Sequence, residues 1–286
     1  MFVNALICDG KTNLLNRNLS KEKGLELDQL PRLQSDCAFI LGNGTSLSHH
    51  DLNLIRGIPS FASNAIYLIF EKTQWRPDYY SCVDTVVLPD QSDEISIWIG
   101  KLKKTIFCFP RRTFPHETPF VPQNVDTIIE PRANVCFFDT LPVNLDGSQK
   151  EVFSLKGDDH IVEPMSVTIT LMQLAVRLGA KKLFLIGCDT EYKIPAWATI
   201  LDQDSRREDK RIILDRDEDP NHFDPRYFGK GKVWHSPNTD LMIRHYEKVK
   251  GVCDQNGIQV YNAGIGGKLE VFPRLHYKDA IDICLR

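Results

Sequence analysis

MSVTITLMQLAVRLGAKKLFLIGCD, residues 165–189, carries the clearest structural signal in this chain. Ser166 stands where a helix N-cap is favoured, and apolar residues then recur at helical spacing. Gly179 ends the helical pattern, and the apolar run FLIGCD, residues 184–189, follows as a buried strand. Units of a helix, a glycine and a strand build open α/β sheets, whose ligands gather at the carboxyl ends of the strands.

Further short apolar runs, each bounded by turn residues, repeat the strand signal. They are CAFILG (37–42), PSFASN (59–64), YYSCVD (79–84), TIFCFP (105–110) and IQVYNA (258–263). Helical patterns cover residues 64–73, 166–178 and 239–255. The alternation predicts an α/β, Rossmann-like domain with a mostly parallel open sheet flanked by helices. We expect it over residues 36–286, after a polar, leucine-spaced N-terminal arm or helix over residues 1–35.

Composition narrows the functional classes. The 286 residues are 42% hydrophobic and 26% charged, which is typical of a soluble globular protein. A formal net charge of −3 gives no reason to expect a nucleic-acid partner. The eight cysteines include no CxxC pair, so a zinc site is not expected, and most lie in apolar runs, which indicates a reducing compartment. No signal peptide or transmembrane stretch is visible, so we expect a cytoplasmic protein. Peripheral membrane association and homo-oligomerisation stay open.

Between residues 191 and 234 the regular pattern stops. This stretch is rich in Asp, Arg and Pro and has no sustained period. A segment of this length inside a compact domain is usually a lid or a disordered insert. Its aromatic residues argue against disorder, and we therefore expect a mobile lid that becomes ordered when substrate binds.

The turn FILGNGTSL, residues 39–47, leaves two interpretations open. Gly42 and Gly44 tolerate positive φ and would let the backbone approach a ligand closely. Polar side chains come from Asn43, Thr45 and Ser46. Backbone N–H groups at the start of a following helix bind anions, which favours a phosphate here. The stretch matches neither GxGxxG nor the P-loop pattern, because Leu47 stands where a third glycine would be, so a plain turn explains it as well.

Two histidines of the 191–235 region are candidates for chemistry. His235, in VWHSPNTD, precedes a helix. Free imidazole titrates near neutrality, which suits a base that takes a proton from a sugar hydroxyl. A structural histidine near a helix start is the alternative. His222 stands beside Asp219, Asn221 and Asp224, which fits a metal site or ordinary turn chemistry.

Charged residues near these histidines can be interpreted in two ways. Lys230 and Lys232 suit a nucleotide diphosphate or an acidic sugar, or they are solvated surface charges. Asp84 and Asp189 each follow an apolar run, where a carboxylate can hold a ribose or a metal, or cap a helix.

Four stretches follow one another in an order that resembles known families. They are FILGNGTSL, FASNAIYLIF, MSVTITLMQLAVRLGAKKLFLIGCD and GKVWHSPNTDLM. This order resembles the bacterial CMP-sialic-acid-dependent sialyltransferases of variant GT-A fold. It also resembles the MptE-like family, named for 6-hydroxymethylpterin diphosphokinase, which includes relatives that glycosylate flagellin. NHFDPRYFGKG and AGIGGKLEVFPR are especially similar to the bacterial members of the second group.

The resemblance to the sialyltransferases implies roles for individual residues. Gly42, Asn43 and Gly44 match the loop that binds CMP, and Asn64 matches an asparagine that contacts the donor nucleotide. Ser166 matches a hydroxyl residue of the pocket, and His235 matches the catalytic base. That family is inverting and needs no metal, so no cofactor is expected.

Two departures from the sialyltransferase pattern bear on the donor. Glu191 stands where that family has a tyrosine stabilising the leaving phosphate, although Tyr192 is adjacent. Asp84 stands where the family has an asparagine, and a carboxylate near a phosphate is repulsive unless it is protonated or bridged by a cation.

Three hypotheses follow. The first is a glycosyltransferase of cell-surface polysaccharide biosynthesis that moves a sialic-acid-type sugar from a CMP donor to a glycan acceptor by single displacement. His235 would be the base, Tyr192 and Lys232 would offset charge on the leaving phosphate, and Thr45, Ser46, Asp84 and Asp189 would line the donor site. The second is a pterin-type diphosphokinase that uses ATP, with Mg²⁺ held by Asp84 and Asp189. The third is a non-catalytic module that binds nucleotide sugars.

Overall fold

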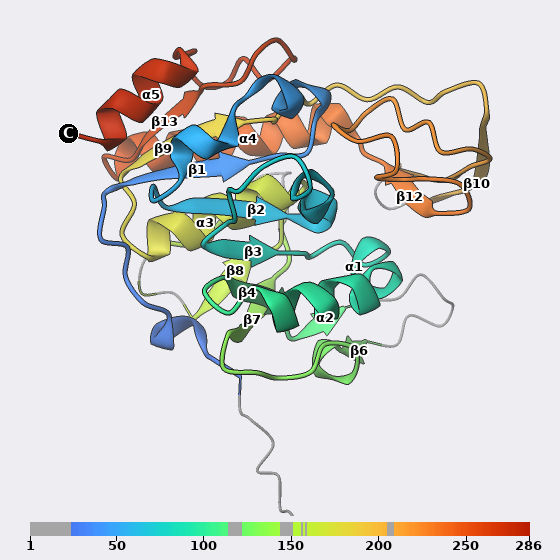
Figure 1. Cartoon of the computed structure of the whole chain (residues 1–286), viewed down its shortest axis with the longest axis horizontal. Coiled ribbons are helices and arrows are strands. Elements are labelled where there is room, and N and C mark those ends of the chain that lie inside the picture. Colours follow the sequence, from blue (N-terminus) through green and yellow to red (C-terminus); the bar gives the residue numbers. More distant parts are fainter. Residues whose placement is uncertain (1–23, 114–121, 144–150, 156, 158, 205–208) are drawn as a thin grey trace, which may run out of the picture.

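A parallel sheet of eight strands forms the centre of the molecule. The computed structural model describes residues 24–113, 122–143, 151–155, 157, 159–204 and 209–286, and its sheet has the order β13-β9-β1-β2-β3-β4-β7-β8 (Figure 1). All the pairings within this sheet are parallel. Its strands are β1 (Cys37–Leu41), β2 (Ser60–Ser63), β3 (Tyr79–Ser81), β4 (Ile106–Pro110), β7 (Val135–Leu141), β8 (His160–Val162), β9 (Lys182–Ile186) and β13 (Gln259–Asn262).

The order of the strands places a switch point beside β1. From β1 the chain adds β2, β3, β4, β7 and β8 on one side, and it then returns to add β9 and β13 on the other side. Loops at the carboxyl ends of β1 and β9 therefore lead to opposite parts of the sheet. In open α/β sheets, this is where a crevice for ligands forms.

Helices and apolar side chains cover both faces of the sheet. Alternate residues of β1 point to opposite faces, with Phe39 and Leu41 in one buried cluster and Ala38 and Ile40 in the other. Residues of α3 and α4 pack in the second cluster, and residues of α1, α2 and α5 pack in the first. The helices are α1 (Val87–Asp90), α2 (Ser92–Lys101), α3 (Val167–Arg177), α4 (Thr239–Gln255) and α5 (Tyr277–Cys284).

Short 3-10 helices and one small strand pair complete the main body. The 3-10 helices are η1 (Leu27–Gln29), η2 (Thr45–His49), η3 (Leu52–Ile55), η4 (Asn64–Ile69) and η5 (Val125–Thr127), and the antiparallel pair is β5 (Arg112–Thr113) with β6 (Gln123–Asn124). No helix among the residues described is both long and apolar enough to cross a bilayer.

The α/β fold predicted from the sequence is confirmed, with additions. All six predicted strands form, and α3 begins after Ser166 and is followed by Gly179 at φ +114° and then β9. The helix expected over residues 64–73 is a shorter, kinked 3-10 helix that ends at Ile69. Strands β7 and β8 and helix α2 were not expected. Of the predicted N-terminal arm, residues 1–23 lie outside the described part, and Leu25 pairs with Cys136 of β7.

The segment 191–234 contains regular structure that its sequence did not indicate. Together with the residues just after it, it forms a second, antiparallel sheet in the order β10-β11-β12, which projects from the carboxyl edge of the large sheet (Figure 1). Its strands are β10 (Ala198–Asp204), β11 (Asp209–Leu214) and β12 (Val233–Ser236). Movement of this segment on binding substrate stays a prediction.

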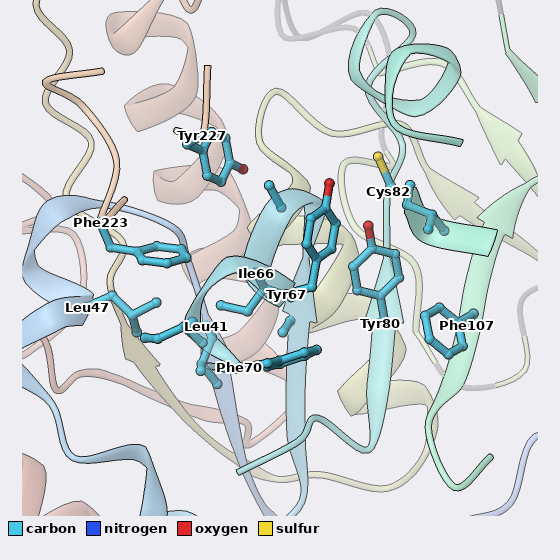
Figure 2. Close-up of a cluster of buried hydrophobic side chains, with 14 of the residues drawn as sticks. Leu41, Leu47, Ile66, Tyr67, Phe70, Tyr80, Cys82, Phe107, Phe223 and Tyr227 are labelled. Atoms are coloured by element: carbon cyan, nitrogen blue, oxygen red, sulfur yellow. The ribbon is translucent and has the colours of Figure 1, made fainter. Parts of the chain in front are cut away.

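The connection between β11 and β12 is packed into the main body. Phe223 and Tyr227 belong to the same buried cluster as Leu41 and Leu47 (Figure 2). The backbone N–H of Phe223 also donates to the carbonyl of Asn43, at 3.0 Å, in the turn that follows β1. This connection is therefore anchored to the switch point, whereas β10 exposes Ile200 to solvent.

We expect Phe223 to anchor the segment energetically. Its side chain is buried, with a relative exposure of 9%, so Phe223→Ala should lower the free energy of unfolding by about 3 kcal/mol or more. Ile200→Ala is the matched control, because Ile200 belongs to the same segment and is 50% exposed, and it should cost about 1 kcal/mol or less. Denaturant unfolding measures both values. Equal losses in the two variants would contradict the anchoring.

Candidate active site at the carboxyl edge of the sheet

The glycines of the turn after β1 are required by packing between loops. Gly44 has φ −64°, and Gly42 also lies outside the positive-φ region, so the expectation that they serve positive φ is wrong. A methyl group at Gly42 would overlap the carbonyl of Gly187, which follows β9. One at Gly44 would lie 2.5 Å from the carboxylate of Asp189. The turn therefore packs tightly against the loop after β9.

Asp189 occupies the position where the sequence suggested a phosphate. Its Oδ2 accepts hydrogen bonds from the backbone N–H of Ser46, at 2.9 Å, and from the hydroxyl of Thr45, at 3.2 Å. Its Oδ1 accepts a short bond from the hydroxyl of Ser46. The carboxylate thus caps the start of η2 and takes the role that an anion has at a helix N-terminus. The donors at the start of η2 are already used by the protein's own carboxylate.

Residues with positive φ follow strands β2 and β9. Among the described residues, only Asn64, after β2, and Thr190, after β9, combine a side chain with positive φ, at +51° and +48°. Both residues line the cavity described below. The carbonyl of Asn64 accepts from the hydroxyl of Tyr80, at 2.8 Å, while its Oδ1 is buried and has no hydrogen-bond partner among the described residues. Such strain and an unused acceptor are more common at functional sites than elsewhere.

Helix α3 directs its N-terminus at the same place. Ser166 is its N-cap residue, but its side chain makes no capping bond and instead accepts from the hydroxyl of Tyr246, at 3.2 Å. Ser166, Val167 and Thr168 all line the cavity. Because the first N–H groups of a helix have no partner within the helix, this end of α3 is a favourable place for a phosphate.

Asp84 and His235 lie next to each other in the wall of the larger cavity. Oδ1 of Asp84 accepts from the backbone N–H groups of Val86 and Val87, at 2.8 and 2.9 Å, so the carboxylate is fixed before α1. Its Oδ2 lies 4.0 Å from Nδ1 of His235, which β12 carries. The carboxylate therefore lies beside the Nδ1 edge of the ring.

Tyr192 brings a phenol to the cavity from the loop that follows Asp189. Burial, with a smaller contribution from the Asp219 carboxylate, raises the pKa of Tyr192 above its ordinary value. Its hydroxyl therefore stays protonated and can donate a hydrogen bond.

Most of the predicted residues line one cleft, which consists of two cavities with shared lining residues. The larger cavity, of about 170 Å³, is lined by Asp84, Ser166, Tyr192 and His235, among others. The smaller one, of about 70 Å³, is lined by the turn after β1 and by Asp189. Residues common to both include Asn64, Ser166, Tyr192, His222 and Tyr227. Thr45 and Ser46 line a separate hollow on the other side of Asp189.

Two basic residues expected near a phosphate lie elsewhere. Nζ of Lys232 is 4.0 Å from Oδ2 of Asp90 in α1, and Lys232 does not line the cavity. Lys230 is exposed, and its backbone N–H donates to Asp217.

Binding of Mg²⁺ by Asp84 and Asp189 stays a prediction. Both carboxylates accept hydrogen bonds from the backbone at the starts of α1 and η2, and a carboxylate that accepts such bonds can still coordinate a metal through its remaining lone pairs. Within the described ranges, no three His, Cys, Asp or Glu side chains gather as ligands.

The sequence did not single out several residues that line the cleft. Glu163 and Met165 come from the connection between β8 and α3, which was missed because β8 has only three residues. Thr190 carries no sequence signal for its positive φ. In the sequence, Tyr227 and Trp234 were noted only as aromatic residues of the charged segment 191–234. Their presence there was the signal that could have identified them as lining residues.

Comparison with known proteins identifies no family for this chain. No family model matches the chain, and no curated protein sequence matches it either. Among solved structures, the MAf glycosyltransferase from Magnetospirillum magneticum AMB-1 is similar, with a TM-score of 0.48 and 16% sequence identity. The match covers 93% of this chain and 39% of that one, so this chain spans about two fifths of the length of that glycosyltransferase. Similarity at this level assigns no function, and the resemblance to MptE-like proteins and sialyltransferases stays a prediction.

We expect Gly44 to be needed for stability. Because a side chain there meets Asp189, Gly44→Ala should lower the free energy of unfolding by about 1–3 kcal/mol. Gly251→Ala in α4 is the control: nothing lies within 4 Å of the added methyl, and alanine there should be neutral or raise stability by up to about 1 kcal/mol. Chemical denaturation compares the two. Unchanged stability of Gly44→Ala would contradict the tight packing between the two loops.

Proposed function

We propose that this protein is a glycosyltransferase that uses a nucleotide-activated sugar. One observation supports it above all. A single cleft at the switch point of the sheet receives a histidine beside a carboxylate, a protonated phenol and the N-terminus of a helix, from four separate parts of the chain. These are the groups that a transfer from a phosphate to a hydroxyl requires: a base, a hydrogen-bond donor and an anion site.

The donor nucleotide would lie in the smaller cavity and its phosphate near α3. Asn64 offers a buried acceptor for the nucleoside, and the turn after β1 shapes the floor. The start of η2 is capped by Asp189, so the N-terminus of α3, beside Ser166, is the better position for the phosphate. The donor class that we propose is a CMP-linked sugar of the sialic-acid type, on the basis of the sequence resemblance.

The acceptor would enter the larger cavity, where His235 lies. His235 takes the proton of the acceptor hydroxyl while the hydroxyl oxygen forms a bond to the anomeric carbon. The bond from that carbon to the phosphate oxygen breaks, and its electron pair leaves with the phosphate. Asp84 stabilises the imidazolium, and the hydroxyl of Tyr192 donates to the leaving group. Lys232 would contribute only if it left Asp90.

A nucleotide screen by thermal unfolding tests the proposal. CMP, CDP, UDP and ATP are each added with and without Mg²⁺, and a nucleotide that binds only the folded state raises the melting temperature. We expect CMP to give the largest shift without metal. A shift with ATP only in the presence of Mg²⁺ would contradict the proposal and favour the diphosphokinase. Binding of a CMP-sugar without transfer to any glycan in a product assay would favour a non-catalytic module.

The base assignment has its own test. His235→Ala should reduce turnover by roughly 10²–10⁴-fold and leave donor binding near that of the wild-type protein, because the imidazole acts on the acceptor. His276→Ala is the control, since His276 is exposed at the start of α5 and does not line the cleft. Steady-state kinetics and isothermal titration separate the two effects. More than about a third of wild-type turnover in His235→Ala would place the base elsewhere.

A further inference from the structure

A buried Asp–His pair forms part of the wall between the two cavities. Nδ1 of His222 lies 2.7 Å from Oδ2 of Asp219, and the side chains are 7% and 1% exposed. His222 lines both cavities, together with Tyr192 and Asn64. The mechanism above leaves this pair unused.

The pair is held rigidly by its surroundings. Asp219 accepts from the backbone N–H of Asn221, at 2.8 Å, and from that of Phe228, at 3.2 Å. The His222 ring is stacked on Tyr227, with centroids 3.8 Å apart and an interplanar angle of 2°, and the edge of Phe228 closes its side. Both the position and the tilt of the imidazole are therefore fixed before a ligand binds.

The carboxylate also determines which ring nitrogen is available. Because Asp219 accepts at Nδ1, the proton of the neutral ring sits on Nδ1, and Nε2 is left for another partner. Nε2 has no hydrogen-bond partner among the described residues. A ring that carries a proton on Nε2 as well can donate there to an anion, while Asp219 still accepts at Nδ1.

An Asp–His pair is costly to bury at this position. Desolvation of two such groups generally costs more than a well-packed apolar pair would, and the ring already has aromatic neighbours on two sides. A rigidly held pair of this kind that also lines a cavity is well placed to bind a charged ligand.

We propose that His222 binds the phosphate of the donor nucleotide and stabilises it as it leaves; this rests on the proposed glycosyltransferase function. His222 lies where the smaller cavity meets the larger one, and Ser166 at the N-terminus of α3 lines both. His235 lines only the larger cavity of the two. His222 thus acts on the phosphate, and His235 acts on the acceptor hydroxyl.

This division of roles keeps the reaction balanced. The acceptor proton goes to His235, a bond forms between the acceptor oxygen and the anomeric carbon, and the bond to the phosphate oxygen breaks. The phosphate keeps the electron pair and gains one negative charge. The Nε2–H of His222 in its imidazolium form donates a hydrogen bond to this charge, and no further reactant is required.

Paired ligands with and without a phosphate test the role. Isothermal titration compares CMP with cytidine, and UMP with uridine as a second pair, on the wild-type protein and on His222→Gln, His222→Phe and Asp219→Asn. The phenylalanine keeps the stack on Tyr227, and the asparagine removes the carboxylate charge beside Nδ1. We expect the wild-type preference for the monophosphate to fall about 10- to 100-fold in both His222 variants and less in Asp219→Asn, with nucleoside affinity retained. His276→Gln, outside the cleft, should keep the full preference.

The outcomes separate this inference from the function on which it rests. A wild-type preference that all three variants keep would overturn the role of His222 and leave the glycosyltransferase proposal standing. Loss of nucleoside binding together with monophosphate binding in every variant would show that the pair only supports the fold, which also overturns the inference. A wild-type protein that binds none of the four ligands would overturn both.

Discussion

The close contact between the loops after β1 and β9 is the constraint on which the cleft depends. The N–H of Gly44 donates to the carbonyl of Gly187, at 2.8 Å, and the N–H of Gly42 donates to that of Ile186, at the same distance. Neither Gly42 nor Gly187 has room for a side chain. Because β1 and β9 lie on either side of the switch point, this contact brings two diverging loops together and leaves the crevice above them.

The same contact decides where charge can be placed. It brings Asp189 to the start of η2, where the carboxylate takes the backbone and hydroxyl donors of Ser46. An anion is therefore repelled from η2 and favoured at the N-terminus of α3, where Ser166 does not use its side chain as a cap. The turn after β1 looks like a phosphate-binding loop in the sequence. In the structure its donors bind Asp189, more than 140 positions away, and the turn forms the floor of the cleft instead.

The sequence predicts the parallel sheet because buried strands and amphipathic helices leave local signals. It also predicts the strand-end carboxylates Asp84 and Asp189, because carboxyl ends of parallel strands share one edge. Asn64 was singled out through the family resemblance, and His235, on the antiparallel strand β12, through its position before a helix and the same resemblance. The sequence cannot predict that Gly44 serves packing, since its partner Asp189 is distant in sequence. Strand β8 is too short for a period, and in β10 to β12 pairing within the small sheet, rather than a helical or strand period, determines the structure.

The irregular sequence of the segment between β9 and α4 reflects the polar side chains that it buries. A residue such as Asp219 can be buried only with donors around it, and those donors come from an aperiodic turn rather than from a helix or a strand. The turn is anchored through Phe223 to the core, while β12 holds His235 on the projecting sheet. One segment therefore brings two imidazoles to the cleft, one from a turn and one from a strand. Both supports are packed on the main body, because Trp234 of β12 lies in the same buried cluster as Phe223.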